Sequence, residues 1–391
     1  MGPAVEPVET KGLPYEDTIF LPAIPGLGSL YTQGIAGSAR SALGLAAPVS
    51  TMELPHVVYQ AAGVSTADLG GQLRAYQELV HEAPSDYLPS GYLHVLAFPL
   101  AMAVMVRPDF PLPLLGMVHL SNDASLFMPV SLGDVLTVKA WAENLRPHPK
   151  GAQVDLVGEV WVEVGNGRVP GSGTLPVGVA APPDGEPVLA WHGVSTYLAK
   201  GVNLSAGEPV QTRDNDSIEP NAILNKNEAL LSDTPDSTTP VILRQASSDE
   251  DAQNAESQKG EDWKPPYPTG RWDLSAGLGR EYAAISGDRN PIHMSALTAK
   301  AFGFPRAIAH GMYTAARALA EVGPGRGPTY RWTVDFAKPV LLPSKVDVSI
   351  RPMQSDNAVP RAAETGGAGY AYQGWNSKKQ IKHFTGTVTP L

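Results

Sequence analysis

The stretch that decides the fold reads PSGYLHVLAFPLAMAVM at residues 89–105, and a faint copy of it reads PRAIAHGMYTAARALAE at residues 305–321. Superposing the two copies places His94 on His310, and a long apolar helix is predicted in each. A single apolar helix needs a sheet against which to bury its side chains. The repeat therefore predicts two similar units in one chain.

Strand-like segments follow each predicted helix. LFMPVSLGDVLTVKAWAENL at 126–145 resembles VDFAKPVLLPSKVDVSIRPM at 334–353, and alternating segments follow at 152–165 in the first copy and at 369–375 and 381–389 in the second. Consecutive strands joined by short turns pair most easily as antiparallel sheets. Each unit is therefore predicted as an α+β fold, and the two together as an internal pseudo-dimer.

The two units are predicted at residues 10–197 and 265–391, with a linker at 198–264. Residues 203–262 hold 13 of the 39 acidic and 4 of the 29 basic side chains, so they carry −9 of the net charge of −10. Such a polar stretch, almost without aromatic residues, cannot bury enough apolar surface to offset its ordering entropy. The linker is predicted to be disordered, with a transient helix at most at 222–231.

The composition indicates a globular protein, with 391 residues, 43% of them hydrophobic and 17% charged. The absence of cysteine excludes disulfides, thiol catalysis and cysteine-based metal centres, and favours a cytoplasmic protein. No signal peptide is expected, and the most apolar stretch, 92–106, is too short to span a membrane. No nucleic-acid partner is expected, since the segments outside the linker are nearly neutral.

An acid, an amide and an imidazole fall within the octapeptide SGDRNPIH at residues 286–293. The spacing of apolar residues upstream predicts a helix that ends at Gly287, and a second helix is predicted after the proline. Asp288 and His293 would project from the turn between them, where a carboxylate and an imidazole can exchange the two protons of water addition or elimination. Capping of the next helix by Asp288 or Asn290 is a second interpretation, and half of a metal site a third.

The second copy of the repeated helix begins at His310 and Gly311. The unpaired N–H groups and the positive dipole end of a helix N-terminus can receive an oxyanion. In an enoyl thioester the carbonyl oxygen gains negative charge as water adds, so the N–H of Gly311 is predicted as its hydrogen-bond donor. A close contact between helix and sheet at this glycine is the alternative interpretation.

A family resemblance joins these features. The stretch YAAISGDRNPIHMSALTAKAFGFPRAIAHGM at 282–312 resembles the MaoC-like hotdog-fold hydratases, which are (R)-specific enoyl-thioester hydratases or 3-hydroxyacyl-thioester dehydratases. With FAKPVLLP at 336–343 and AENLRPHPKGAQVDLV at 142–157, the chain is similar to the actinobacterial two-hotdog dehydratases of fatty-acid metabolism. The resemblance implies a double hotdog, in which an antiparallel sheet wraps a long central helix in each unit.

By matching position, the resemblance implies that Asp288 and His293 hold the catalytic water and that Gly311 supplies the oxyanion-binding N–H. The implied reaction is the reversible addition of water to a trans-2-enoyl thioester, which gives an (R)-3-hydroxyacyl thioester. Three further residues are predicted to support this site: Asn290, Ser286 and His310. Five are predicted to contact the substrate: Tyr282, Phe304, Met312, Phe98 and Met102.

The N-terminal unit departs from the family pattern. Residues 79–94 read LVHEAPSDYLPSGYLH, without GDxNPxH, and Val95 takes the place of Gly311. This unit is predicted to be catalytically silent and to supply the acyl pocket and the pseudo-dimer interface. Phe98 and Met102 would line that pocket, and packing in the core is the alternative for both.

The resemblance implies no metal or redox cofactor, and a substrate carried on coenzyme A or on an acyl carrier protein. Association of the pseudo-dimer into a further homodimer is left open. The alternative function is a non-catalytic acyl-thioester-binding or assembly subunit of a fatty-acid or polyketide system. The histidines outside the motif are predicted as ordinary core or surface residues: His119, His148 and His192.

Overall fold

The computed structural model describes residues 15, 17–42, 53–114, 117–163, 186–202, 204, 263–353 and 369–391. Apart from Leu204, the predicted acidic segment lies outside the described residues, as does its patch at 222–231. None of the described helices is long and apolar enough to cross a bilayer.

The described part of the N-terminal unit contains three α-helices and six strands. The helices are α1 (Leu27–Ala42), α2 (Gly70–Val80) and α3 (Ser90–Met105), and the 3-10 helix η1 (Ala67–Leu69) precedes α2. The strands are β1 (Asp17–Leu21), β2 (Val57–Ser65), β3 (Val118–Leu126), β4 (Val135–His148), β5 (Gly151–Val162) and β6 (Val188–Lys200).

The described part of the C-terminal unit contains four α-helices and five strands. The helices are α6 (Leu278–Ser286), α7 (Pro291–Met294), α8 (Ala296–Ala301) and α9 (Gly311–Val322), and the 3-10 helix η2 (Gly323–Arg326) follows α9. The strands are β7 (Gly270–Leu274), β8 (Tyr330–Phe336), β9 (Ser344–Pro352), β10 (Tyr370–Asn376) and β11 (Ile381–Pro390).

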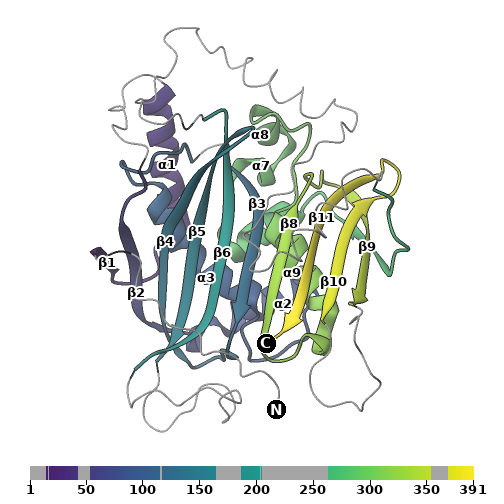
Figure 1. The fold of residues 1–391 in the computed structure, drawn as a ribbon, viewed down its shortest axis with the longest axis horizontal. Helices are drawn as coiled ribbons and strands as arrows, with labels where there is room; N and C mark the ends of the chain where they lie inside the picture. The colour runs from purple at the N-terminus through teal and green to yellow at the C-terminus, as the bar shows by residue number, and fades with distance from the viewer. Residues whose placement is uncertain are drawn as a thin grey trace, which may run out of the picture.

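One continuous sheet joins the two units, and its strand order is mirrored about the junction (Figure 1). Outward from the junction the order is β3-β6-β5-β4-β2 on one side and β8-β11-β10-β9-β7 on the other, with β1 parallel to the outer edge of β2. Strands β3 and β8 pair antiparallel, and Arg331 of β8 binds Asp123 of β3 through two contacts of 2.9 and 2.7 Å. The predicted double hotdog with an internal pseudo-dimer is confirmed.

The central helices α3 and α9 lie on the same side of this sheet (Figure 1). Every residue of α3 except Phe98 is buried, as expected of a helix that is apolar on all sides. The two helices approach closely at Gly91 and Ala316, where a Cβ added to the glycine would lie 3.2 Å from the alanine Cβ. The helices that the sequence repeat predicts are therefore neighbours across the pseudo-dimer interface.

The strands depart from the prediction at one place in each unit. The stretch 126–145, predicted as one strand, is irregular between β3 and β4, and 337–343 separates β8 from β9 in the same way. Each irregular segment contains proline, which cannot donate a hydrogen bond to a neighbouring strand. At the other boundary, β6 continues to Lys200, beyond residue 197.

Candidate active site

The loop that carries SGDRNPIH is held by local hydrogen bonds at both ends. Helix α6 ends at Ser286, and Gly287 follows with a φ of 74°, which glycine adopts without strain. Ser286 Oγ donates to the carbonyl of Tyr282 at 2.9 Å and accepts the N–H of Asp288 at 3.2 Å. At the other end, Asn290 caps α7 by accepting an N–H bond of 3.3 Å. Ser286 and Asn290 thus shape the loop, and the capping alternative holds for Asn290.

The single helix predicted after the proline is instead the pair α7 and α8. Ser295 has an extended backbone between them, and its side chain accepts the N–H of Thr298 at 3.1 Å to cap α8. The break leaves α7 as one turn, which ends just after His293.

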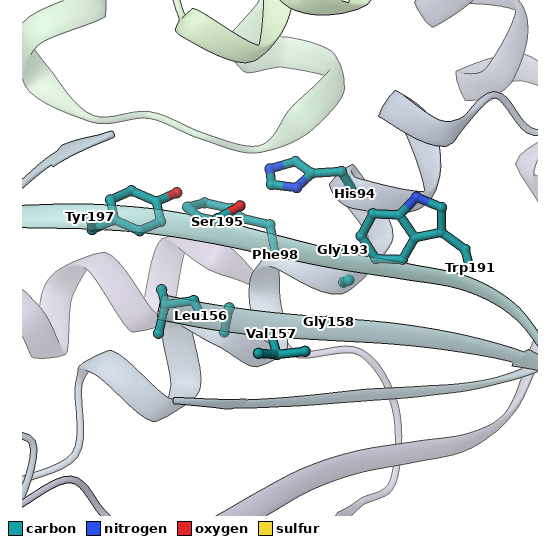
Figure 2. A pocket seen from close by; sticks show the side chains of 11 residues that line it. His94, Phe98, Leu156, Val157, Gly158, Trp191, Gly193, Ser195 and Tyr197 are labelled. Atoms are coloured by element: carbon teal, nitrogen blue, oxygen red, sulfur yellow. The ribbon is translucent and has the colours of Figure 1, made fainter. Parts of the chain in front are cut away.

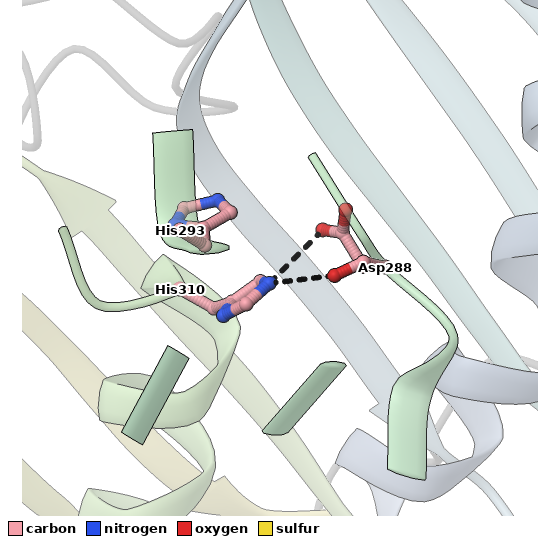
Figure 3. A group of neighbouring side chains, drawn as sticks. All are labelled: Asp288, His293 and His310. Carbon is pink, nitrogen blue, oxygen red and sulfur yellow. Dashed lines mark hydrogen bonds and ion pairs between the residues drawn. The ribbon is translucent and has the colours of Figure 1, made fainter. Parts of the chain in front are cut away.

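Asp288, His293 and His310 come together at this loop (Figure 3). The two imidazoles stack with their centroids 3.7 Å apart. His310 Nε2 donates to the backbone carbonyl of Asp288 at 3.0 Å and lies 3.7 Å from Asp288 Oδ2. His293 Nδ1 donates to the carbonyl of Ile308 at 2.8 Å, which leaves Nε2 of the neutral ring as a proton acceptor.

The environment favours one charge state for each member of this trio. Burial lowers the pKa of His293 to about 3 and also lowers the pKa of His310, so both imidazoles are neutral at pH 7. Burial would raise the pKa of the Asp288 carboxyl, but the hydrogen bonds that it accepts from the Tyr31 hydroxyl and the Asn290 N–H favour its ionised form, and its pKa lies below the usual value. The site therefore presents an ionised carboxylate beside a neutral imidazole base.

We expect the free energy of unfolding to decrease as the pH falls below about 6.5. Burial lowers the pKa of His94 to about 4 and of His119 and His293 to about 3, whereas an unfolded histidine titrates near 6.5. Between these pKa values the unfolded chain binds more protons than the folded one. Each imidazole therefore lowers the free energy of unfolding by up to about 1.4 kcal/mol for each pH unit that the pH falls. Urea unfolding at pH 7.5, 6.5, 5.5 and 4.5 measures the slope.

A matched variant assigns this slope to its source. His94→Gln removes one of the three imidazoles and should reduce the slope by at most about 1.4 kcal/mol per pH unit. A free energy of unfolding that stays constant from pH 7.5 to 4.5 in the unsubstituted protein contradicts the prediction.

The trio also has the spacing of a metal site, with one donor atom from each residue within 4.8 Å of the others. While His310 Nε2 donates to the Asp288 carbonyl it has no lone pair for a metal, and only the buried Nδ1 of that ring could serve as a ligand; the hydrogen bonds of the trio favour proton transfer. We therefore interpret the grouping as acid–base machinery, and the expectation that no cofactor is needed stays a prediction.

Gly311 is the first residue of α9, and His310 is its N-cap. The N–H of a first-turn residue has no partner within the helix and remains available for a substrate oxygen. A Cβ added at this glycine would lie 2.9 Å from two atoms of the Phe336 ring, so the aromatic ring covers the helix start at contact distance. The close contact between helix and sheet is therefore present at this position, and the role of the Gly311 N–H as an oxyanion donor stays a prediction.

The N-terminal unit forms the opposite wall of the site with side chains that the sequence did not assign to it. Tyr31 of α1 donates a hydrogen bond to Asp288 Oδ1. The His119 ring stacks on Tyr197 at 4.5 Å and lies 5.1 Å from the Phe336 ring, which covers Gly311. His119 Nε2 is buried and has no hydrogen-bond partner among the described residues. His119, predicted as an ordinary core or surface residue, therefore lies beside Phe336, the residue that covers Gly311.

A small cavity continues from this wall between α3 and the strands β5 and β6 (Figure 2). His94 and Phe98 of α3 face it, with ring centroids 5.9 Å apart. Gly158 and Gly193 pair across the strands at its floor, beside the ring of Trp191. The cavity volume of about 20 Å³ is room for about one water molecule.

The five residues predicted to contact the substrate lie in different places. The Tyr282 ring packs 4.9 Å from the His310 ring, and Met312 is buried in the first turn of α9. Phe98 lines the cavity, whereas Met102 is buried one turn further along α3 in the hydrophobic core. Phe304 is partly buried in the segment between α8 and α9. All five assignments stay predictions.

Comparison with known proteins shows which proteins this site resembles. The family described as MaoC like domain matches residues 272–364, which include Asp288, His293 and Gly311. Most of the C-terminal unit is therefore similar to this family. Over 317 residues, 81% of this chain and 84% of the relative, the sequence is 29% identical to 3-hydroxyacyl-thioester dehydratase X of Mycobacterium tuberculosis.

A second relative matches a shorter part of this chain. The chain is 42% identical to 3-hydroxybutyryl-CoA dehydratase of Methylorubrum extorquens over 73 residues, which are 18% of this chain and 46% of the relative. Among solved structures, a crystal structure of HtdX from Mycobacterium tuberculosis superposes with a TM-score of 0.56 at 25% identity, covering 85% of this chain and all of that one. The likeness to HtdX therefore spans both units.

Proposed function

We propose that this MaoC-like protein is a hydro-lyase that adds water reversibly to trans-2-enoyl thioesters and gives (R)-3-hydroxyacyl thioesters in fatty-acid metabolism. The observation that carries the proposal is the ionised Asp288 beside neutral His293, next to the helix start at Gly311. The names of the two dehydratase relatives support the same reaction. A non-catalytic acyl-binding subunit would have no need for this charge arrangement.

The reaction divides between the two ends of the site. A water molecule donates one proton to His293 Nε2 and its other hydrogen bond to the Asp288 carboxylate, and its oxygen adds to C3 of the enoyl group. Negative charge moves to the thioester oxygen, and the N–H of Gly311 donates a hydrogen bond to that oxygen. The acid–base pair then returns one proton to C2, so that the net change is addition of one water. Dehydration follows the same steps in reverse.

Several finer features belong to the proposal. The substrate is carried on coenzyme A or on an acyl carrier protein, and the chemistry above uses no metal or redox cofactor. The lack of cysteine favours the reducing cytoplasm as its location. Association of two chains into a homodimer would add to the pseudo-dimer already present within one chain.

The acyl chain is proposed to enter the cavity beneath α3, and Trp191 to limit its length. Trp191 is 1% exposed, and its indole N–H donates to Ser90 Oγ at 2.7 Å, which fixes the ring over Gly193. In Trp191→Leu we expect kcat/KM for medium-chain substrates to rise about tenfold relative to the four-carbon substrate, since each buried methylene is worth about 0.8 kcal/mol. A chain-length series of enoyl-CoAs measures this ratio.

The matched control is Trp161→Leu, which makes the same change on β5 outside the cavity, where the indole binds Glu159. Its chain-length ratio should equal that of the unsubstituted protein. If the chain-length ratio of kcat/KM is also unaltered in Trp191→Leu, the acyl chain does not occupy this cavity.

The direct test of the proposed reaction is loss of enoyl absorbance when the purified protein meets crotonyl-CoA and longer trans-2-enoyl-CoAs. The 3-hydroxyacyl product should be the (R) enantiomer by chiral chromatography. The same series on acyl carrier protein separates the two carriers. Tight binding of the thioester without turnover on either carrier would favour the non-catalytic acyl-binding alternative.

A further inference from the structure

Helix α1 of the N-terminal unit covers the loop that carries Asp288. Leu27 is 7% exposed and lies against Gly287, where an added Cβ would be 2.9 Å from a leucine methyl carbon. One turn later Leu30 is buried as well, and α1 also contacts α3. The helix thus bridges its own unit and the catalytic loop of the other.

Tyr31 lies four residues after Leu27, so the two side chains share one face of α1 and reach the same loop. Its hydroxyl donates to Asp288 Oδ1, and the same oxygen accepts the backbone N–H of Asn290 at 3.1 Å. The other oxygen, Oδ2, is 3.7 Å from His310 Nε2. One carboxylate oxygen is therefore held by two donors, and the other is left for the reacting water.

We propose that Tyr31 is a positioning residue of the hydratase reaction, which holds the Asp288 carboxylate in one orientation from the opposite unit. This inference rests on the proposed function for its role in turnover, but its effect on the carboxylate does not depend on turnover. It also assigns the N-terminal unit a part in the chemistry, although that unit lacks the GDxNPxH motif.

The surroundings of Tyr31 keep its hydroxyl protonated, so that it donates to the Asp288 carboxylate. Burial first, and then the nearby Asp288 charge, raise the pKa of Tyr31 far above its usual value, so the hydroxyl remains a donor at all working pH values. A hydrogen bond to a charged acceptor is also stronger than one between neutral groups. The ionisable groups that interact with the carboxylate come from α1, α3, β3, β6, α6, α7 and the N-cap of α9: Tyr31, His94, His119, Tyr197, Tyr282, His293 and His310.

Tyr31→Phe keeps the ring and removes the donor. We expect kcat to fall about 10- to 100-fold, as for the loss of one hydrogen bond to a charged group, while KM changes by less than about twofold. The Asp288 pKa should rise, because the ionised form loses a partner. Carbon-13 NMR of protein labelled at aspartate carboxyls measures that pKa, with the resonance assigned by its absence in Asp288→Asn.

Two comparisons make the test specific. Tyr15→Phe removes another tyrosine hydroxyl of the N-terminal unit, which donates to the carbonyl of Ala142 at 2.8 Å, and should leave kcat and the Asp288 pKa unchanged. Replacing Tyr31 with 3-fluorotyrosine keeps its shape and strengthens the donor, so the Asp288 pKa should fall, even if the phenylalanine variant does not fold.

The outcomes separate this inference from the proposed function. An Asp288 pKa that is the same with tyrosine, phenylalanine and fluorotyrosine at position 31 overturns the inference, even when kcat falls, since Tyr31 would then act only through packing. If the unsubstituted protein hydrates no enoyl thioester, the proposed function fails, and the Asp288 pKa still decides whether Tyr31 holds the carboxylate.

Discussion

Asp288→Asn is expected to lower kcat for enoyl-thioester hydration by about 10²- to 10⁴-fold, the range typical of losing a general acid–base group. The amide keeps the shape of the carboxylate and still offers Tyr31 and Asn290 an oxygen, so the loop should fold as before. It is neutral, however, and binds the reacting water more weakly than a carboxylate does, because hydrogen bonds to a charged acceptor are the stronger ones. Because the group acts in the transition state, KM should change far less than kcat.

Initial rates with crotonyl-CoA measure this loss, and two further variants define its origin. Asp273→Asn changes an exposed aspartate that pairs with Lys345 at 3.2 Å and should retain full activity. His293→Ala should be similarly slow, and combining it with Asp288→Asn should add little, since residues that act as a unit are not additive. Full activity in both single variants would exclude the proposed reaction.

The architecture could be predicted because its signals are local. An apolar helix followed by alternating strands recurs in the chain, and the mirrored strand order is the consequence of folding that pattern twice. The octapeptide likewise predicted the loop, since Gly287 and Asn290 act through bonds to residues a few positions away. The proline-containing segments hid the breaks between strands, because apolar residues continue through them.

The wall contributed by the N-terminal unit could not be predicted in the same way. Tyr31 lies 257 positions before Asp288, and only the packing of α1 on the other unit brings the two together. His119 reaches the site only because β3 lies at the junction with β8. Neither Tyr31 nor His119 lies in a sequence motif comparable to SGDRNPIH.

The overlay of the two repeats also concealed a difference at their helix starts. His94 aligns with His310 in sequence, but α3 begins at Ser90, so His94 lies inside its helix, whereas His310 precedes α9 as the N-cap. The His94 imidazole faces the cavity (Figure 2), whereas the His310 imidazole donates to the Asp288 carbonyl. In this overlay α3 therefore begins about one turn earlier than α9, and the catalytic silence of the N-terminal unit stays a prediction.

Gly311→Ala is expected to lower kcat about 10²- to 10³-fold, the loss typical of removing one oxyanion donor. The added Cβ would lie 2.9 Å from the Phe336 ring, so either the ring or the start of α9 must shift. We expect this shift, or the methyl group itself, to hinder the hydrogen bond between the N–H and a thioester oxygen. Stability should not fall through helix propensity, because alanine is a better helix former than glycine. Stopped-flow rates and a thermal melt separate the two effects.

Phe336→Leu supplies the control, because it makes room beside position 311 without touching the N–H. If the methyl group itself blocks the oxygen, the double variant Gly311→Ala with Phe336→Leu stays as slow as Gly311→Ala alone. If displacement of the ring is the cause, the double variant recovers towards the rate of Phe336→Leu. An unaltered kcat in Gly311→Ala would exclude both causes and contradict this prediction.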